Sequence, residues 1–209
     1  MKNRMIYVYI FNTMADWEPA YILAELSSKR YFRKDAPNLT VRTCALTRDA
    51  IQTMGGLTVV PDLTVDEIEP QNGALLLLPG GDKWLDPSQA KIIGKAKEFL
   101  QAGVAVAAIC GATEALAEAG MLDDRPHTSN DLRYLQYICK SYKGGDHYQD
   151  QPVVTDGDLI TATGLAPLEF AQHILRKLDV FLPDTLDIWY RLNKTQDPQL
   201  FFALMKTLG

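Results

Sequence analysis

GVAVAAICGATEALA, residues 103–117, is the stretch that decides the fold expected of this chain. The small and β-branched residues 104–109 predict a strand that is buried on both faces. Cys110 ends that strand, and Gly111 and Ala112 begin an alanine-rich stretch that predicts a helix. A sharp strand-to-helix turn exposes the side chain at the bend and needs small neighbours, because the backbone is crowded there. The pattern predicts a nucleophile elbow with Cys110 as the candidate nucleophile.

Two interpretations of Cys110 are open on this stretch alone. A thiol at a helix N-terminus feels the positive end of the helix dipole and unpaired N–H groups, which favour the reactive thiolate. Free cysteines are also among the most frequently buried residues, so a structural thiol is the alternative. The neighbouring motifs favour the reactive thiol.

Composition predicts one compact domain over residues 1–209. The chain is 47% hydrophobic and 22% charged, and its net charge of −5 offers no basic face to a nucleic acid. Its apolar runs are too short to span a membrane, so we expect no membrane contact and no signal peptide. Three cysteines without a CxxC motif indicate reduced thiols and a cytoplasmic location.

Apolar strand patterns alternate with amphipathic helix patterns along the chain. This alternation predicts an α/β fold with a mostly parallel sheet and helices on both faces, and its site at the carboxyl ends of the strands. We expect strands at 5–11, 39–46, 73–78 and 104–109, and hairpins at 51–60 and 153–163. We expect helices at 17–30, 88–101, 131–142 and 165–178, one after Cys110, and a helical segment at 184–208 interrupted by Pro198.

Gly80 and Gly81 follow the predicted strand 73–78 and are candidates for an anion site beside Cys110. Consecutive N–H groups of paired glycines can bind a developing oxyanion. A tight turn that requires positive φ is the alternative. The residues expected to wall this crevice are Asp16, Gly80, Trp84 and Ala112.

Glu18 lies in the connection after the first predicted strand, at the same sheet edge. A carboxyl that points toward Cys110 and keeps its proton can donate a hydrogen bond to a thiolate. The alternative is an acidic residue that only complements the dipole of the following helix. We expect Asp16 to be the N-cap of that helix.

The three histidines of the chain give only one candidate base for Cys110. His173 is expected on a helix and His147 in a glycine-rich loop, whereas His127, after the Cys110 helix, is a candidate base. No two histidines have the spacing of metal ligands, and no dinucleotide fingerprint, phosphate loop or Gly-x-Ser-x-Gly motif is present. We therefore expect neither a metal nor a cofactor.

Four motifs together resemble the ThiJ/PfpI (DJ-one) superfamily: ADWE at 15–18, LLLPGG at 76–81, AAICGA at 107–112 and TDGDLITATGLAPLEFA at 155–171. The resemblance covers residues 5–178 and implies a flavodoxin-like sandwich that forms a homodimer. It also implies that Cys110 is the nucleophile, Glu18 its carboxyl partner, and the Gly81 and Gly111 amides an oxyanion site.

One position departs from the superfamily pattern. Hydrolytic members carry a histidine after two hydroxyl residues in the loop beyond the nucleophile helix, but here PHTSND at 126–131 places Asn130 there. The Cys–His machinery is therefore in doubt. Either His127 reaches the thiol, or Asn130 orients a group, or Cys110 works with Glu18 alone.

The resemblance implies a cysteine-dependent hydrolase of the PfpI type, peptidase- or amidase-like, with a small carbonyl compound or a peptide as substrate. The alternatives are a redox-sensing or chaperone-like stress protein, and a glyoxalase-, deglycase- or isonitrile hydratase-like enzyme. Amidotransferase activity is not expected, because no His-x-Glu motif stands late in the chain. Residues 179–209 extend beyond the superfamily core and predict a helical pair on the domain, with a dimer contact or a lid as the alternative.

Overall fold

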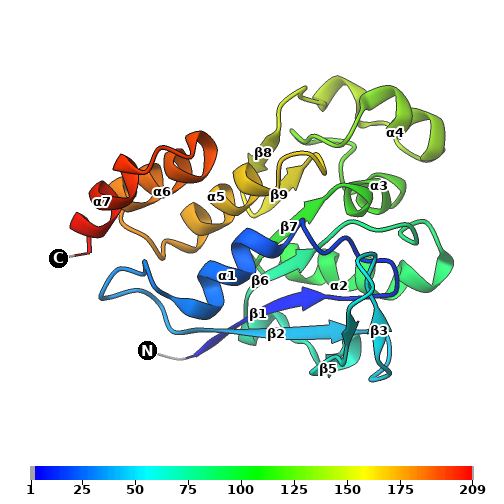
Figure 1. Ribbon diagram of the computed structural model, residues 1–209. Coiled ribbons are helices and arrows are strands. Elements are labelled where there is room, and N and C mark those ends of the chain that lie inside the picture. The colour runs from blue at the N-terminus through cyan, green and yellow to red at the C-terminus, as the bar shows by residue number, and fades with distance from the viewer. Residues whose placement is uncertain (1–2, 209) are drawn as a thin grey trace.

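A seven-stranded sheet with the order β5-β2-β1-β6-β7-β9-β8 forms the centre of the molecule (Figure 1). The structure, a computed structural model, describes residues 3–208. Every neighbouring pair of strands is parallel except the hairpin β8–β9. The strands are β1 (Arg4–Tyr9), β2 (Leu39–Ala45), β5 (Leu63–Thr64), β6 (Gly73–Leu78), β7 (Ala105–Ile109), β8 (Val153–Asp156) and β9 (Leu159–Ala162), and a separate hairpin pairs β3 (Ile51–Gln52) with β4 (Thr58–Val59).

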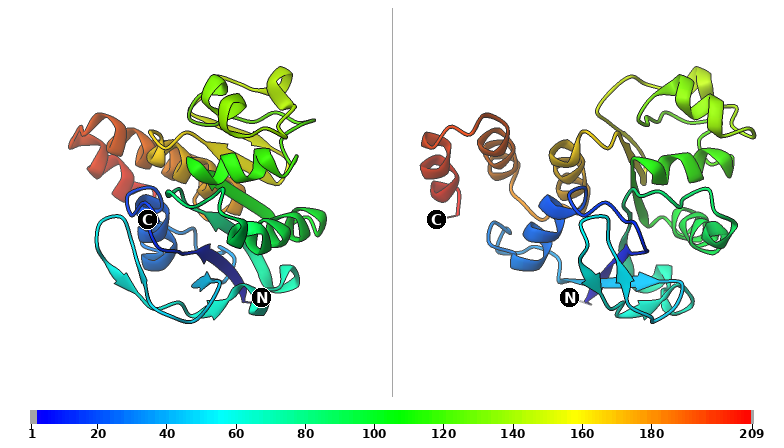
Figure 2. Two further views of the ribbon diagram at one scale, coloured as in Figure 1. Left: turned by 90° about the vertical axis from the view of Figure 1, so that its right-hand side faces the viewer. Right: turned by 45° about the vertical axis from the view of Figure 1, so that its right-hand side comes forward.

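Helices cover both faces of this sheet, which confirms the predicted flavodoxin-like sandwich. Helices α1 (Ala20–Ser28) and α5 (Pro167–Leu178) lie on one face, and α2 (Ala90–Gln101) and α3 (Gly111–Glu118) on the other (Figure 2). The other helices are α4 (Leu132–Ile138), α6 (Pro183–Thr195) and α7 (Gln199–Lys206), with 3₁₀ turns at Val65–Glu67, Pro70–Asn72, Pro87–Gln89 and Gly144–His147. No helix within residues 3–208 is long and apolar enough to cross a membrane.

The continuous apolar runs of the sequence become strands that are buried on both faces. All six residues of β6 and all five of β7 are buried. A fully buried leucine contributes roughly 2 kcal/mol by leaving water, so these two strands anchor the core. They end side by side, because Leu78 pairs with Ala108, and this register brings the loops after β6 and β7 together.

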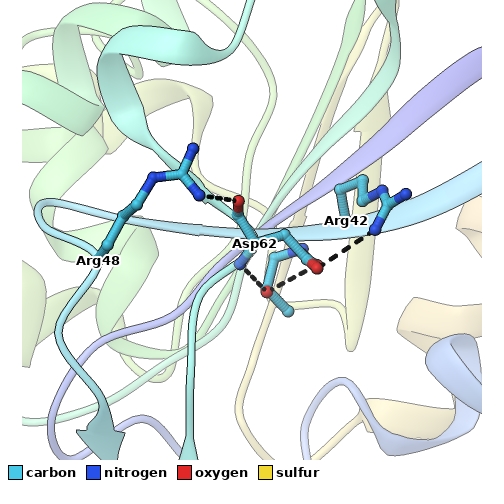
Figure 3. A network of polar contacts seen from close by, with 4 residues as sticks. Arg42, Arg48 and Asp62 are labelled. Carbon is cyan, nitrogen blue, oxygen red and sulfur yellow. Dashed lines mark hydrogen bonds and ion pairs between the residues drawn. The ribbon is translucent and has the colours of Figure 1, made fainter.

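A polar network ties down the β2–β5 edge of the sheet (Figure 3). Asp62 accepts from Arg42 at 3.3 Å and from the Thr43 amide at 2.8 Å, and its carbonyl oxygen accepts from Arg48 at 2.7 Å. These contacts hold the short strand β5 on an edge that has few ladder hydrogen bonds of its own.

The C-terminal helices pack on the outer side of the α1 and α5 layer. Trp189 of α6 is 1% exposed, and its indole N–H donates to Glu25 Oε1 of α1 at 3.1 Å. Tyr190 and Lys194 both reach Glu169 of α5, at 3.0 and 2.6 Å. The predicted helical segment 184–208 divides at Pro198, the residue that precedes α7.

Candidate active site

The connection between β7 and α3 holds Cys110 in the geometry of the predicted elbow. Cys110 has φ 58° and ψ −129°, a conformation that a non-glycine residue adopts at a cost of about 1–3 kcal/mol. Its N–H donates to the Ala162 carbonyl at 3.0 Å, and its carbonyl accepts from the Thr113 amide at 3.0 Å and hydroxyl at 2.6 Å. Hydrogen bonds on both sides of the residue therefore hold the strained turn in place.

Glycine at position 111 is required by the close approach of two backbones. A Cβ added to Gly111 would lie 2.9 Å from the Gly81 carbonyl oxygen and 3.1 Å from Trp84 Cδ1. The loops that follow β6 and β7 therefore meet directly beside the thiol.

The Glu18 carboxyl lies beside Cys110, although Glu18 belongs to the loop before α1, far from Cys110 in the sequence. Its side chain is 1% exposed, and Oε2 accepts from the Gly80 amide at 2.5 Å. A Cβ added to Gly164 would lie 2.9 Å from Cys110 Sγ and 3.1 Å from Glu18 Oε1, so thiol and carboxyl converge on one point. Oε1 is buried and accepts no hydrogen bond of ordinary geometry within residues 3–208.

Burial dominates the protonation of this pair. Loss of water raises the pKa of Glu18 to about 7, although the Gly80 amide and the thiol partly oppose the shift. Burial, and then the Glu18 charge, raises the pKa of Cys110 to about 11, against the Asn130 amide and the Gly111 N–H, which favour the thiolate. In the free protein near neutral pH the proton therefore stays on sulfur, and Glu18 titrates close to neutrality.

Asn130 is the residue of the 126–131 loop that contacts the thiol. Its Nδ2 donates to Cys110 Sγ at 3.3 Å, while its Oδ1 accepts from the Gly164 amide at 2.8 Å. The second bond fixes which end of the amide faces the sulfur. Asn130 thus supplies a neutral donor at the position where the resemblance expects a histidine.

Replacing Asn130 with Asp is expected to slow alkylation of Cys110 by iodoacetamide at pH 8 roughly tenfold. Aspartate keeps the acceptor for the Gly164 amide, but it places a negative oxygen beside Sγ, so the thiol pKa rises further. Asn130→Ala, which removes the donor without adding charge, is expected to slow the reaction less. Equal rates in the wild type and the Asp variant would contradict this role.

The backbones of Gly81 and Gly111, the two residues expected to supply the oxyanion site, approach each other closely beside Cys110. The added Cβ at Gly111 is 3.7 Å from the Gly81 nitrogen, and Gly111 is the first residue of α3, where N–H groups have no partner within the helix. Gly81 has a positive φ of 158°, which residues with a side chain rarely adopt, as the alternative for this pair expected, and its Cβ would lie 2.7 Å from Phe11 Cζ and the Thr13 carbonyl oxygen. Gly80 is instead required by close approach, because its Cβ would lie 2.6 Å from Glu18 Oε2.

His127 is engaged away from the thiol. It is fully buried, Nδ1 contacts the Arg125 carbonyl at 2.8 Å and Nε2 contacts the Tyr142 hydroxyl at 2.6 Å. Burial lowers its pKa, which favours the neutral ring. Of the two loop candidates, the structure brings Asn130 and not His127 to Cys110.

The predicted N-cap of the first helix is wrong. Residues 16–19 form turns, α1 begins at Ala20 after Pro19, and Asp16 Oδ2 accepts from the Gly55 amide of the β3–β4 hairpin at 2.6 Å. In these turns the Glu18 side chain is buried beside Cys110 and does not lie on a helix surface. Asp16 thus fastens the hairpin beside the site.

A hollow of about 300 Å³ opens at Cys110, and its walls differ from those expected. Trp84 is buried beneath it, donating to the Pro79 carbonyl at 2.8 Å, and Ala112 is fully buried. Neither residue lines the hollow, nor do Asp16 and Gly80. The lining residues are Ala15, Trp17, Glu18, Met54, Gly81, Asp82, Cys110, Gly111, Glu114, Asn130 and Tyr134.

Sequence reasoning missed Trp17, Met54, Glu114 and Tyr134 as lining residues. A weak signal existed for Glu114, which lies in the first turn of the helix that follows Cys110. Met54 comes from the β3–β4 hairpin, whose packing over the elbow no local pattern indicates.

Comparison with known proteins accounts for this arrangement. The family model described as the DJ-1/PfpI family matches residues 4–177. The chain belongs to the DJ-1/PfpI family. The matched segment ends just before α6, so the DJ-1/PfpI domain carries the elbow, Glu18 and Asn130, and the C-terminal helices lie beyond it.

Several proteins that are similar to this chain have names that denote an enzyme. A Bacillus subtilis protein named "Uncharacterized protease YoaZ" is 49% identical over 209 residues, covering 100% of both chains. The solved structure of a thiJ/pfpI family protein from Bacillus anthracis is 48% identical, with a TM-score of 0.96, covering 100% of this chain and 98% of that one. A more distant relative, "Deglycase PfpI" from Pyrococcus furiosus, is 29% identical over 63% of this chain and 78% of its own length.

Proposed function

We propose that the protein is a cysteine-dependent hydrolase of small acyl substrates, amides or peptides, in which Glu18 serves as the base that histidine provides in Cys–His enzymes. The observation that carries this proposal is a buried carboxyl beside the thiol, whose Oε1 has no partner other than the thiol among residues 3–208 and whose pKa is raised by burial to about 7. A base that titrates near the working pH is the most effective proton acceptor. The relative named as a protease supports hydrolysis over the alternatives.

The first step forms an acyl-enzyme. Cys110 Sγ attacks the substrate carbonyl carbon while its proton moves to Glu18 Oε1, so the sulfur does not have to ionise beforehand at its raised pKa. The Gly81 and Gly111 N–H groups donate to the oxygen that becomes negative. As the C–N bond breaks, Glu18 returns the proton to the leaving nitrogen.

The second step releases the product. Water takes the place of the leaving group, Glu18 accepts one of its protons, and hydroxide adds to the acyl carbon. Collapse of this intermediate breaks the C–S bond and releases the carboxylic acid, and the Cys110 sulfur takes the proton back from Glu18, so both groups return to their starting states. Asn130 donates to the sulfur as it leaves and so favours the thiolate.

Trapping of the acyl-enzyme tests this proposal. Incubation with p-nitrophenyl acetate and rapid acid quenching is expected to give a protein heavier by one acetyl group, with the group on Cys110 by peptide mass spectrometry. Cys44 and Cys139 serve as internal controls, because burial raises the pKa of each thiol to about 12. An acetyl group elsewhere, or an equal amount in Cys110→Ser, would overturn the proposal.

Addition of the thiol to an aldehyde is a second candidate, because one relative is named a deglycase. The same amides would stabilise the hemithioacetal oxygen, but no leaving group departs. Turnover of methylglyoxal in the absence of acyl-enzyme formation would favour this candidate over hydrolysis.

A further inference from the structure

The charges that line the hollow at Cys110 all have one sign. Asp82 and Glu114 lie on its walls together with Glu18, and the lining residues include no lysine, arginine or histidine. Lys83, the neighbour of Asp82, lines a different hollow, together with Phe11. The walls therefore present an uncompensated negative potential around the thiol.

Neither carboxylate is satisfied by the protein itself. Within residues 3–208 no ion pair or hydrogen bond reaches the carboxyl oxygens of Asp82 or Glu114, and Glu114 is only partly exposed. Burial raises the pKa of Glu114 to about 7, as expected of a carboxyl that lacks a counter-charge. The third carboxyl, Glu18, also lines the hollow and is 1% exposed, and its Oε1 accepts no hydrogen bond of ordinary geometry within residues 3–208.

Apolar and aromatic side chains form the rim around these acids. Trp17 is 51% exposed, Tyr134 50% and Met54 44%, and all three line the hollow. The exposed face of an aromatic ring attracts an organic cation, most strongly in the case of tryptophan. Carboxylates below aromatic rings suit a group that is both positively charged and partly apolar.

We propose that the hollow selects substrates that carry an organic cation, an ammonium or guanidinium group, next to the reacting carbonyl. Asp82 and Glu114 hold the charge, Trp17 and Tyr134 cover the apolar part, and anionic substrates are rejected. This inference rests on the proposed function of Cys110, but the potential of the hollow can be measured without turnover.

Charged thiol reagents test selection at Cys110. Methanethiosulfonates carrying trimethylammonioethyl, sulfonatoethyl or methyl groups react when sulfur attacks the sulfenyl sulfur, a disulfide forms and methanesulfinate leaves. The preference is the rate constant with the cationic reagent divided by that with the anionic reagent. At low salt this ratio is expected to be roughly tenfold larger for the wild-type protein than for the free thiol 2-mercaptoethanol. Asp82→Asn with Glu114→Gln is expected to abolish the preference, and 1 M salt to reduce it; the rate with the methyl reagent corrects for any change in the reactivity of the thiol itself.

Glu118→Gln is the matched control. It removes one negative charge from the same helix, but its carboxyl accepts from Ser141 and does not line the hollow. The preference is expected to persist in this variant. A wild-type preference equal to that of 2-mercaptoethanol, or one unchanged in the double variant, would overturn the proposal.

Tryptophan quenching gives a readout that needs no reactive thiol. Trp84 and Trp189 are 2% and 1% exposed, so collisional quenching reports on Trp17. Caesium is expected to quench at least threefold better than iodide, relative to N-acetyltryptophanamide, and the double variant to lose this bias. If caesium quenches no better than iodide, the cation proposal is overturned. If caesium quenches better but no reagent labels Cys110, the result counts against the proposed role of the thiol and not against the cation proposal.

Discussion

Replacement of Glu18 with Gln is expected to reduce kcat/KM roughly a thousandfold and to make Cys110 easier to ionise. Glutamine can keep the hydrogen bond from the Gly80 amide, but it cannot accept the thiol proton, and loss of a general base costs about 10²- to 10⁴-fold. Removal of the Glu18 charge also removes a cause that raises the thiol pKa. Faster labelling by iodoacetamide at pH 8, together with lost turnover, would separate the base from a merely structural carboxyl.

The pH dependence of the wild type follows from the same group. Only ionised Glu18 can accept a proton, so kcat/KM is expected to rise with pH through about 7. This limb of the profile should vanish in Glu18→Gln. A limb that stays in place in the variant would assign it to another residue.

As pH rises through about 7, the free energy of unfolding is expected to fall, whereas kcat/KM rises. The folded pKa of Glu18, about 7, lies above its ordinary value of 4.5, so the folded state keeps this proton to higher pH than the unfolded state. The contribution of Glu18 to stability is therefore complete below about pH 4.5 and is lost as pH rises through 7. At pH 8 the ionised group costs up to about 3 kcal/mol, and urea unfolding of Glu18→Gln is expected to show a gain of this order.

Glu25 provides the matched control, since it is another glutamate near the same helix and is 2% exposed. Its carboxyl is fully occupied by Arg30, at 2.5 and 3.1 Å, and by the Trp189 indole. Glu25→Gln is expected to keep activity and lose stability. Equal losses of activity in both variants would show that the effect of Glu18 is indirect.

Gly144→Ala is expected to destabilise the fold by about 3 kcal/mol or more. A Cβ at this position would lie 2.1 Å from the Leu122 carbonyl oxygen and 2.9 Å from Tyr142 Cε2. Backbone must move to relieve the first contact, and such overpacking costs more than a shift of one flexible side chain. The midpoint of urea unfolding measures the loss.

The adjacent glycine gives the comparison. A Cβ at Gly145 would meet only Gln136 Nε2, at 3.0 Å, which is the end of a flexible side chain. Gly145→Ala is therefore expected to change stability by less than about 1 kcal/mol. A loss in Gly145→Ala as large as that in Gly144→Ala would contradict the steric argument.

The sheet and the elbow could be predicted because local pattern determines them. The run before Cys110 is apolar on both faces, and only a strand between two helical layers buries such a run. The N-cap of α1 could not be predicted, because Asp16 binds the amide of Gly55, which lies 39 residues away, and that contact depends on how the β3–β4 hairpin packs.

The carboxyl partner of the thiol could be named from the sequence, but not its surroundings. Trp84 appeared suited to a wall because it follows two glycines, yet it packs against Tyr9 and Phe11 in the core. Tyr134 and Trp17 reach the hollow from separate loops and helices, so only their tertiary arrangement identifies them. Side-chain direction at loop residues is set by packing and not by spacing along the chain.

The contact between Trp189 and Glu25 joins residues that are 164 positions apart, and therefore bears on the order in which the chain can fold. Helix α1 is synthesised well before α6, the helix that covers its outer side. Until α6 has been made, Glu25 has Arg30 as its near neighbour in the chain, and the surface on which Trp189 packs has no cover from that side chain. We therefore expect a nascent chain that lacks α6 to expose apolar surface on α1, which is the kind of surface that makes folding intermediates prone to aggregation.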